Sequence, residues 1–275
     1  MSTSTETASG TGAGTPPGPV RADCLADAEG GIVFRVRGTA AADAGALVLR
    51  RRGGGVGEEL RLPLTEAAGG VLRAELPASA ATAEGRWTVT TDTGRVVEPG
   101  LRDLRAVVDR TPGPGPLTVR VPYPGAGGRL VIRCWLRTAH AEAGPLDVSP
   151  GGTLSVTGRL HGTALGPDAR AEARTPGADG AERVHRVSVT GEGGTFAFTL
   201  PYAPLAEAGT GEERTWELWL RPAAGADELR IARILDDVWD KREIFRFPEH
   251  RTPAWHAVPC YTADNELGIR LTPRP

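Results

Sequence analysis

The stretch Leu235-Asp236-Asp237-Val238-Trp239-Asp240-Lys241 decides how this chain is read, because a second stretch of the same pattern lies 131 positions earlier. The earlier stretch is Leu104-Arg105-Ala106-Val107-Val108-Asp109-Arg110, and both follow Leu-x-x-Val-(Val/Trp)-Asp-(Arg/Lys). Internal repetition of this kind marks a structural unit that is written more than once. The two stretches therefore predict two units of similar fold.

Further pairs of landmarks surround the two stretches in the same order. Their offset grows along the chain, from 124 through 129 and 131 to 137 positions, as a few loop insertions in the second unit would produce. The alternative is that a composition rich in Gly, Ala and Arg creates the matches, but chance matches would not keep this order. The pairs are Gly38-Thr39-Ala40 with Gly162-Thr163-Ala164, 69–77 with 193–201, Trp87 with Trp216, and 121–123 plus 130–133 with 258–261 plus 267–270.

Length and charge fit two ordinary globular domains. A domain usually takes ~100–200 residues, so 275 residues accommodate two. We expect a disordered tail over 1–19, one β-sandwich over 20–136 and a second over 137–275. A net charge of -2 with 24% charged residues gives no field of a single sign, so nucleic acid is not an expected partner.

Cysteine usage and hydropathy favour a cytoplasmic location. Residues 1–19 lack the basic and apolar regions of a signal peptide, and no window reaches the ~18 apolar residues of a membrane span. Cys24, Cys134 and Cys260 are too scattered for a disulfide framework or a zinc site. An accessory part of a membrane-surface enzyme would also be cytoplasmic.

Short runs that alternate apolar and polar residues recur between Gly- and Pro-rich turns in both units. Successive side chains of a strand point to opposite faces, so alternation predicts strands buried on one side. Many such runs are typical of an antiparallel sandwich. We predict an all-β fold of two tandem immunoglobulin-like β-sandwiches, with strands over 32–38, 46–51, 59–64, 71–76, 86–90 and 130–135, and over 153–160, 169–174, 182–189, 195–200, 215–220, 228–232 and 267–271.

No long amphipathic helix is predicted. The nearest candidate is 229–239, but its alternation also fits a strand followed by a turn. We therefore favour extended structure there and, by analogy, over 101–108.

The motifs of common catalytic sites are missing from the sequence. It contains no nucleophile elbow, Walker loop, dinucleotide fingerprint or paired zinc histidines. His250 and His256 flank Pro253 and could approach each other, but no third ligand accompanies them, so surface histidines are favoured over a metal site. We expect no catalytic residue, no metal and no cofactor.

The carboxylate cluster Asp236, Asp237, Asp240 and Glu243 is the strongest argument for an enzyme. Paired carboxylates can act as general acid and base or hold a divalent cation. This leaves open a transferase or hydrolase that uses Asp236, Asp237 and Asp240.

A structural role for Asp240 is favoured over catalysis. Asp240 alone in this cluster has an acidic equivalent in the first unit, Asp109, and a basic residue follows each. Such a carboxylate fits a turn cap that accepts backbone N–H bonds, or an ion pair with an arginine such as Arg133 or Arg270.

Tryptophans divide into a repeated and an unrepeated set. Trp87 and Trp216 match between the units, and alternation places Trp216 on the core face of its strand. The unrepeated tryptophans are Trp219, Trp239 and Trp255. They fit either sugar stacking, in which the indole packs against the apolar face of a ring, or an interface between the two sandwiches. The candidate ligand-binding residues are Trp219, Trp239, Trp255, Asp236, Asp237 and Arg221.

Two segments of the second unit carry a resemblance to a known family. The run 236–248, Asp-Asp-Val-Trp-Asp-Lys-Arg-Glu-Ile-Phe-Arg-Phe-Pro, is followed by Pro259-Cys260-Tyr261-Thr262-Ala263-Asp264-Asn265-Glu266-Leu267. Residues 210–275 thereby resemble β-sandwich modules beyond the catalytic domain of some actinobacterial transferases of cell-wall polymer synthesis, namely glycosyltransferases and glycerophosphotransferases of teichoic-acid type. The resemblance implies an accessory role beside a transferase. The nucleotide-sugar-binding domain of those enzymes has no counterpart here, so no transferase site carries over.

These observations predict a soluble, non-catalytic module. Its expected partner is a polysaccharide or cell-envelope polymer, or the glycosyltransferase that makes it. The alternatives are a protein–protein assembly module, possibly a homo-oligomer, and the carboxylate enzyme described above.

Overall fold

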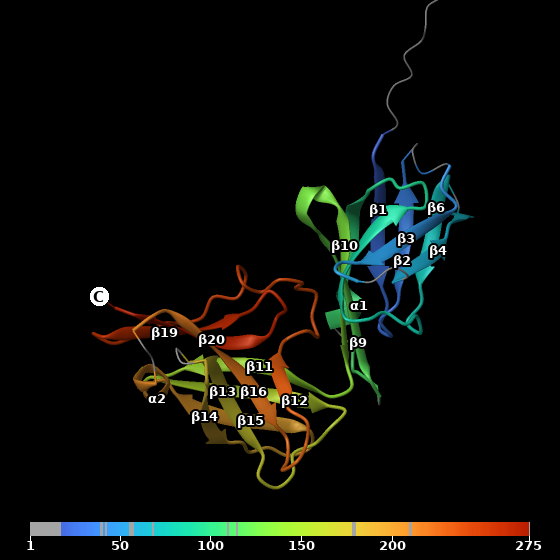
Figure 1. The fold of residues 1–275 in the computed structure, drawn as a ribbon. Helices are drawn as coiled ribbons and strands as arrows, with labels where there is room; N and C mark the ends of the chain where they lie inside the picture. The colour runs from blue at the N-terminus through green and yellow to red at the C-terminus, as the bar shows by residue number, and fades with distance from the viewer. Residues whose placement is uncertain are drawn as a thin grey trace, which may run out of the picture.

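The protein is described by a computed structural model, which covers residues 18–38, 41, 43–54, 58–67, 69–108, 110–113, 115–177, 180–208 and 211–274. Residues 1–17 of the expected tail, and Asp109, lie outside this range. The described chain is nearly all β, as predicted, and none of its helices is long and apolar enough to cross a membrane. Figure 1 shows two bodies, one blue to green and the other yellow to red.

The first body is a β-sandwich of two five-stranded sheets, which we call the first sandwich. Its sheets have the orders β5-β6-β2-β1-β8 and β4-β3-β7-β10-β9. β1 and β8 run parallel, and the other neighbours are antiparallel. The elements are β1 (Val20–Ala26), β2 (Ile32–Arg37), β3 (Ala46–Arg51), β4 (Glu59–Pro63), β5 (Thr65–Ala67), β6 (Val71–Leu76), β7 (Gly85–Thr91), β8 (Val97–Asp103), α1 (Arg105–Val108), β9 (Leu117–Pro124), η2 (Ala126–Gly128) and β10 (Leu130–Arg137).

The second body, the second sandwich, continues from His140. Its strands follow the path β15-β12-β11-β17-β16-β20-β19-β18, and β13 pairs with both β14 and β16. β17 joins the two halves of this path, since it pairs with β11 in parallel and with β16 in antiparallel fashion. The elements are β11 (His140–Val148), β12 (Thr153–His161), β13 (Arg170–Pro176), β14 (Glu182–Ser188), β15 (Thr195–Pro201), α2 (Ala203–Glu207), β16 (Arg214–Arg221), β17 (Leu229–Ala232), β18 (His250–Arg251), β19 (Trp255–Tyr261) and β20 (Leu267–Pro273).

The two sandwiches share a strand order. β6-β2-β1-β8 corresponds to β15-β12-β11-β17, and β4-β3-β7-β10-β9 corresponds to β14-β13-β16-β20-β19. The parallel pairs also correspond, because β1–β8 matches β11–β17. Descent from one duplicated unit, the boundary at 136/137 and the immunoglobulin-like class stay predictions from the sequence.

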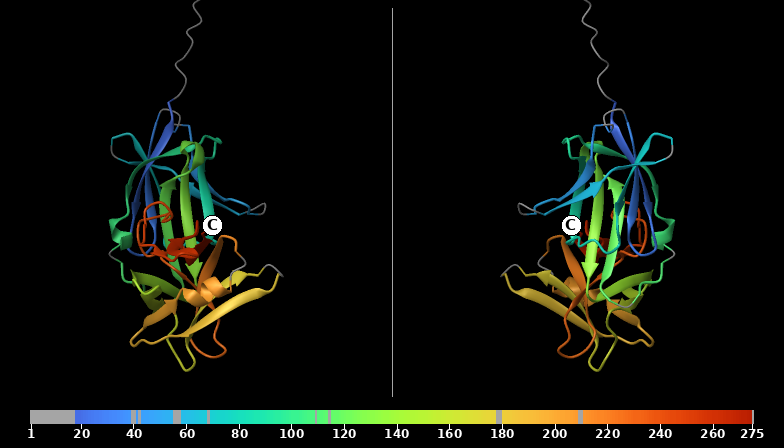
Figure 2. Two further views of the ribbon diagram at one scale, coloured as in Figure 1. Left: turned by 90° about the vertical axis from the view of Figure 1, so that its left-hand side faces the viewer. Right: turned by 90° about the vertical axis from the view of Figure 1, so that its right-hand side faces the viewer.

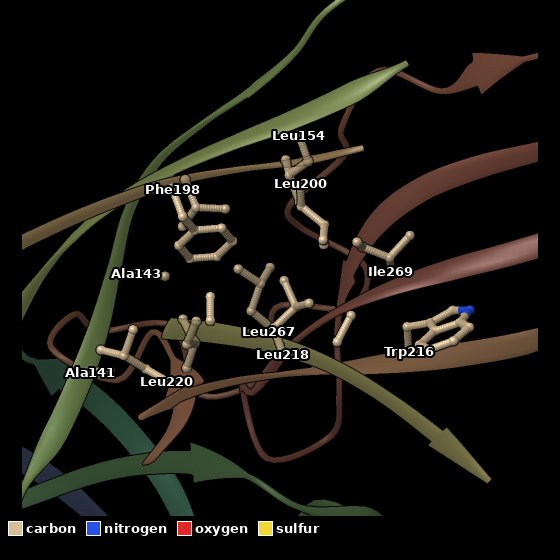
Figure 3. Packing of buried hydrophobic residues seen from close by; sticks show 14 of the residues in the cluster. Ala141, Ala143, Leu154, Phe198, Leu200, Trp216, Leu218, Leu220, Leu267 and Ile269 are labelled. Atoms are coloured by element: carbon tan, nitrogen blue, oxygen red, sulfur yellow. The ribbon is translucent and has the colours of Figure 1, made fainter. Parts of the chain in front are cut away.

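Alternation along the strands explains how each core forms. In β16, Trp216, Leu218 and Leu220 are buried while Glu217 is exposed and Trp219 is half-buried, as the period of two requires. Figure 3 shows these residues packed with apolar side chains of β12 and β15 across the second sandwich and of the neighbouring strand β20. Burial of such a side chain stabilises the fold by roughly 1.5–3 kcal/mol. In the first sandwich Trp87 takes the corresponding buried position.

The segment after β8 differs from the expectation of extended structure over 101–108. The strand ends at Asp103, and Arg105–Val108 forms a helical turn, α1. Leu104 and Val107, three positions apart, are both buried in a third apolar cluster, which a helical spacing allows and a strand does not. In the second sandwich, the predicted strand followed by a turn is confirmed, since β17 ends at Ala232 and bends follow.

The third apolar cluster joins the two sandwiches. It combines β9 and β10 residues of the first, such as Val119 and Trp135, with Ala232 and Ile234 of the second. In Figure 2 both views place β9 and β10, drawn in green, against the second sandwich. The two sandwiches therefore share buried apolar surface.

Candidate functional site

The six predicted ligand-binding residues lie in three separate places. Trp239, Asp236 and Asp237 belong to the irregular segment after β17, which faces the first sandwich. Trp219 and Arg221 lie on the outer face of β16. Trp255 begins β19, where it packs against the second core and lies 5.5 Å from the His250 ring. The structure brings Trp219 together with Arg221 and leaves the other two tryptophans elsewhere.

Trp239 is part of the contact between the sandwiches. Its indole stacks on Tyr123 of β9, with ring centroids 4.2 Å apart and an interplanar angle of 13°. It also packs against the third apolar cluster. One face of this indole is thus already covered by a protein ring, as the interface alternative anticipates.

Asp236 holds its own segment together. Its Oδ1 accepts hydrogen bonds from Lys241 Nζ (2.6 Å) and the Val238 backbone N–H (3.0 Å), and its Oδ2 pairs with Arg233 (3.0 Å). Lys241, which is 0% exposed, also donates to the Val238 carbonyl oxygen (2.9 Å). Burial lowers the pKa of Lys241, and the Asp236 charge opposes this shift. Asp237, by contrast, is exposed.

Asp240 caps a turn, as the sequence indicates, but its arginine partner differs from the two proposed. Its Oδ1 accepts the Arg242 backbone N–H (3.1 Å), and its carboxylate pairs with the Arg242 guanidinium (2.6 Å). The hydrogen bonds from Arg242 lower the pKa of Asp240. The expected pairing with Arg133 or Arg270 is wrong, because the Asp240 carboxylate pairs with Arg242, two positions away in the sequence.

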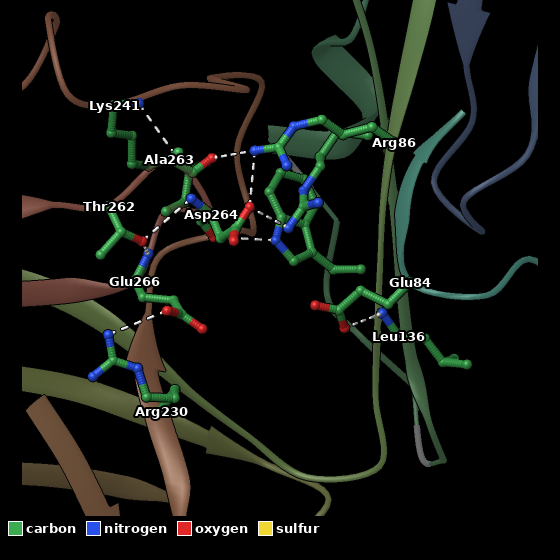
Figure 4. A network of polar contacts seen from close by, with 12 residues as sticks. Glu84, Arg86, Leu136, Arg230, Lys241, Thr262, Ala263, Asp264 and Glu266 are labelled. Atoms are coloured by element: carbon green, nitrogen blue, oxygen red, sulfur yellow. Dashed lines mark hydrogen bonds and ion pairs between the residues drawn. The ribbon is translucent and has the colours of Figure 1, made fainter. Parts of the chain in front are cut away.

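A hairpin turn between β19 and β20, residues 262–266, holds the irregular segment after β17 in place. Buried Asn265 adopts a positive φ of 61°, accepts the Lys241 backbone N–H (3.1 Å) and donates to the Val238 carbonyl oxygen (2.9 Å). Asp264 of the same turn reaches the first sandwich, where Arg86 (2.8 Å) and Arg133 (2.9 Å) pair with its carboxylate. Figure 4 shows this bridge between the two bodies.

Trp219 lies in a ladder of charged side chains on the outer sheet face. Across the strands its neighbours are Glu172 of β13 and Arg230 of β17. The guanidinium groups of Arg174 and Arg230 each lie 5.0 Å from its ring centroid, and its Nε1 donates to Glu217 (3.2 Å). These contacts hold the indole plane in one orientation.

A cavity of about 360 Å³ opens beside Trp219, between the two sandwiches. This volume lies within the range of small-ligand sites, about 300–1,000 Å³. Its charged groups are paired within the wall, Arg137 with Glu84, and Arg230 with Glu266 (3.1 Å). The lining residues are Glu84 and Arg137 from the first sandwich, and Ala139, His140, Trp219, Glu228, Leu229, Arg230 and Glu266 from the second.

Arg221 contacts the wall of this cavity through a lining residue. It pairs with Glu228, which also pairs with Arg174 (2.5 Å). Arg221 therefore acts through Glu228 and is not itself part of the cavity lining.

Sequence reasoning missed most of the cavity. Glu84 and Arg137 belong to the first sandwich, whereas the unrepeated tryptophans all belong to the second. Glu228 and Glu266 are common surface residue types with no motif around them. The available signal was Trp219 itself, an unrepeated indole between charged neighbours.

No metal centre accompanies these residues. In the part of the chain that the structure describes, no three His, Cys, Asp or Glu side chains are grouped to hold a metal ion. His250 lies near the rings of Tyr202 and Trp255, and His256 lies 3.6 Å from Glu249.

Comparison with known proteins gives few likenesses. No family model and no curated protein matches the chain. Among solved structures, a pullulanase from Anoxybacillus sp. LM18-11 complexed with maltotriose shares 13% identity, with 75% of this chain and 25% of that chain covered, at a TM-score of 0.26. A pullulanase type I from Bacillus subtilis str. 168 complexed with maltose shares 8% identity, with 76% and 24% covered, at a TM-score of 0.25. The chain spans about a quarter of the length of these structures, and at such TM-scores the likeness carries no conclusion about fold or function.

Proposed function

We propose that the protein is a non-catalytic β-sandwich module that binds a glycan of a cell-envelope polymer in the cavity beside Trp219. The observation that carries the proposal is the partly exposed indole in the wall of a polar cavity. A sugar ring has an apolar face of C–H groups and an edge of hydroxyls, so it needs an aromatic surface beside hydrogen-bonding groups.

The cavity supplies both kinds of group. The part of the Trp219 ring that Arg174 and Arg230 leave accessible provides the aromatic surface. The carboxylates of Glu228 and Glu266 provide acceptors for hydroxyl protons. The guanidinium groups of Arg137 and Arg230 donate to hydroxyl oxygens. Because the ion pairs within the wall already fix these side chains, little side-chain entropy is lost on binding.

The resemblance of residues 210–275 to accessory modules of cell-wall polymer transferases supports the choice of ligand. A module of this type would hold the growing polymer close to the enzyme that extends it. Two sandwiches in fixed contact would give the polymer a surface that runs across both bodies.

Isothermal titration calorimetry with soluble cell-envelope polysaccharides and teichoic-acid fragments tests the proposal. We expect saturable binding to one polymer, and Trp219→Ala should weaken it at least tenfold with a change of only a few degrees in melting temperature. Trp255→Ala removes a tryptophan outside the cavity and should leave the affinity within twofold.

Two results would overturn the proposal. One is binding that both tryptophan variants weaken equally, and the other is no binding to any polymer of the panel. An oligomer on a sizing column without glycan would instead favour the assembly function.

A further inference from the structure

A second cavity, of about 470 Å³, lies in the second sandwich and shares no lining residue with the Trp219 cavity. Its floor is the outer face of β16, β20 and β19, and its wall is the segment between β17 and β18. Its lining residues are Thr215, Arg242, Glu243, Phe245, Arg246, Phe247, Glu249, Val258, Pro259, Cys260, Tyr261, Thr262 and Arg270. Both segments that carry the resemblance, 236–248 and 259–267, contribute to it.

Three arginines line this cavity, and one of them forms no ion pair within the described chain. Arg242 pairs with Asp240 (2.6 Å) and Arg246 pairs with Glu243 (2.8 Å). Arg270 forms no ion pair with the carboxylates of the described chain.

The remaining carboxylate of the lining is already engaged. Glu249 pairs with Arg251 (2.6 Å) and lies 3.6 Å from His256. The hydrogen bond from Arg251 lowers the pKa of Glu249, so it stays ionised and bound to its own partner. The Arg270 charge also lowers the pKa of Glu249, but no carboxylate of the described chain forms an ion pair with Arg270.

Aromatic rings form the other wall. Phe245 lies 5.6 Å from Tyr261 and 6.4 Å from Phe247, measured between ring centroids. The Arg233 guanidinium (5.0 Å) and Lys241 Nζ (5.7 Å) lie over the Phe245 ring and fix its position. Phe245 and Phe247 are half-buried, so each leaves part of its ring accessible.

The three arginines line the same cavity. Arg270 projects from the middle of the floor, where it lies between Thr215 of β16 and Val258 of β19 in the strand register. Arg242 and Arg246 are exposed residues of the segment between β17 and β18, where each guanidinium group pairs with a single carboxylate. A guanidinium presents planar donors that match the oxygens of a phosphate in bidentate fashion.

We propose that this cavity binds a phosphate ester with an apolar body, with its phosphate at Arg270 and its apolar part against Phe245 and Phe247. A dianionic group suits a site with three guanidinium groups better than a monoanion, because it gains from each of them. The proposal is independent of glycan binding beside Trp219, since the two cavities have different walls.

Titration with phenyl phosphate at low ionic strength, followed by calorimetry, tests the inference. We expect saturable binding that Arg270→Gln weakens at least tenfold. Arg21→Gln is the matched control, because Arg21 is an exposed arginine paired with Glu98 on the first sandwich (3.1 Å), and it should change the affinity less than twofold.

A second variant separates the two halves of the site. Phe247→Leu should weaken phenyl phosphate and leave inorganic phosphate unchanged, and circular dichroism verifies that both variants are folded. The proposal is overturned if phenyl phosphate does not bind, if Arg270→Gln and Arg21→Gln weaken it equally, or if benzoate binds as tightly as phenyl phosphate.

Discussion

Trp239 of the second sandwich lies flat against Tyr123 of the first, with ring centroids 4.2 Å apart. The stack joins residues 116 positions apart in the chain and closes one side of the third apolar cluster. An aromatic pair of this geometry contributes about 0.5–1.5 kcal/mol beyond its buried area. The stack gives Trp239 a role as a contact residue between the two sandwiches.

Trp239→Ala should loosen the two sandwiches. The loss of the stack and of buried area is expected to cost about 2 kcal/mol in the free energy of unfolding, measured by urea denaturation. Small-angle scattering should show a larger radius of gyration. Trp239→Phe keeps a ring at this position and should retain most of the stability, and an unchanged radius in the alanine variant would contradict this role.

Asp264→Asn should weaken the polar half of the same contact. Arg133 is 5% exposed, and burial lowers the pKa of its guanidinium, so the loss of the Asp264 charge leaves a buried cation without a partner. We expect a loss of about 1–3 kcal/mol. Glu98→Gln breaks the exposed pair with Arg21 and should cost less than about 0.5 kcal/mol. Equal losses for the two variants would show that the Asp264 bridge is no more than a surface pair.

Lys241→Met should be strongly destabilising although the two side chains have similar volumes. It leaves the Asp236 carboxylate, which is 13% exposed, without its lysine. Removing one partner of a buried pair typically costs about 3–5 kcal/mol, whereas replacing both with apolar residues can be nearly neutral. The double variant Lys241→Met with Asp236→Leu should therefore recover stability relative to Lys241→Met. A double variant less stable than either single one would show that Asp236 acts mainly through Val238 and Arg233.

The Glu172 carboxylate should make the free energy of unfolding depend on pH in the acid range. Burial alone would raise the pKa of this carboxyl, but hydrogen bonds from Arg170, Arg174 and Arg186 outweigh it and lower the pKa from 4.5 to about 2. A depressed folded-state pKa stabilises the fold above the unfolded value, and this contribution is lost as the pH falls from about 4.5 to about 2. Its size is of the order of 3 kcal/mol.

Urea denaturation of Glu172→Gln across this pH range checks the assignment. The variant should be less stable than the parent at neutral pH, and the difference should shrink as the pH falls. A difference that stays constant from pH 7 to pH 2 would mean that the charge of Glu172 does not matter.

Local patterns predicted most of the strands. The alternation Trp216-Glu217-Leu218-Trp219-Leu220 correctly assigns the buried and outer faces of β16, because successive side chains of a strand point to opposite faces of the sheet. The all-β class followed from many such runs. The strands β1, β5, β9, β11, β18 and β19 were not predicted, and β8 was predicted only in part. In β1 and β11 the buried positions are largely small residues such as Ala22, Cys24 and Ala143, which give a weak alternation.

Contacts between the sandwiches could not be predicted. Whether Trp239 faces a ligand or a protein ring depends on Tyr123, which no local pattern connects to it. The same holds for the Trp219 cavity, because two of its charged lining residues, Glu84 and Arg137, belong to the first sandwich. The turn-capping role of Asp240 was predictable from the sequence. Its ion pair with Arg242 was not, because it depends on a bend of the backbone that the sequence pattern does not show.

The burial of Lys241 has a practical consequence, because it is the single lysine among 32 basic Lys and Arg residues. Acylating reagents attack uncharged amines that they can reach, and the native fold offers them no lysine. An added acyl mass on Lys241 would therefore record an opening of the segment between β17 and β18, in the way that hydrogen exchange records the opening of a backbone amide. The acyl mark on Lys241 would record, molecule by molecule, whether this segment had opened.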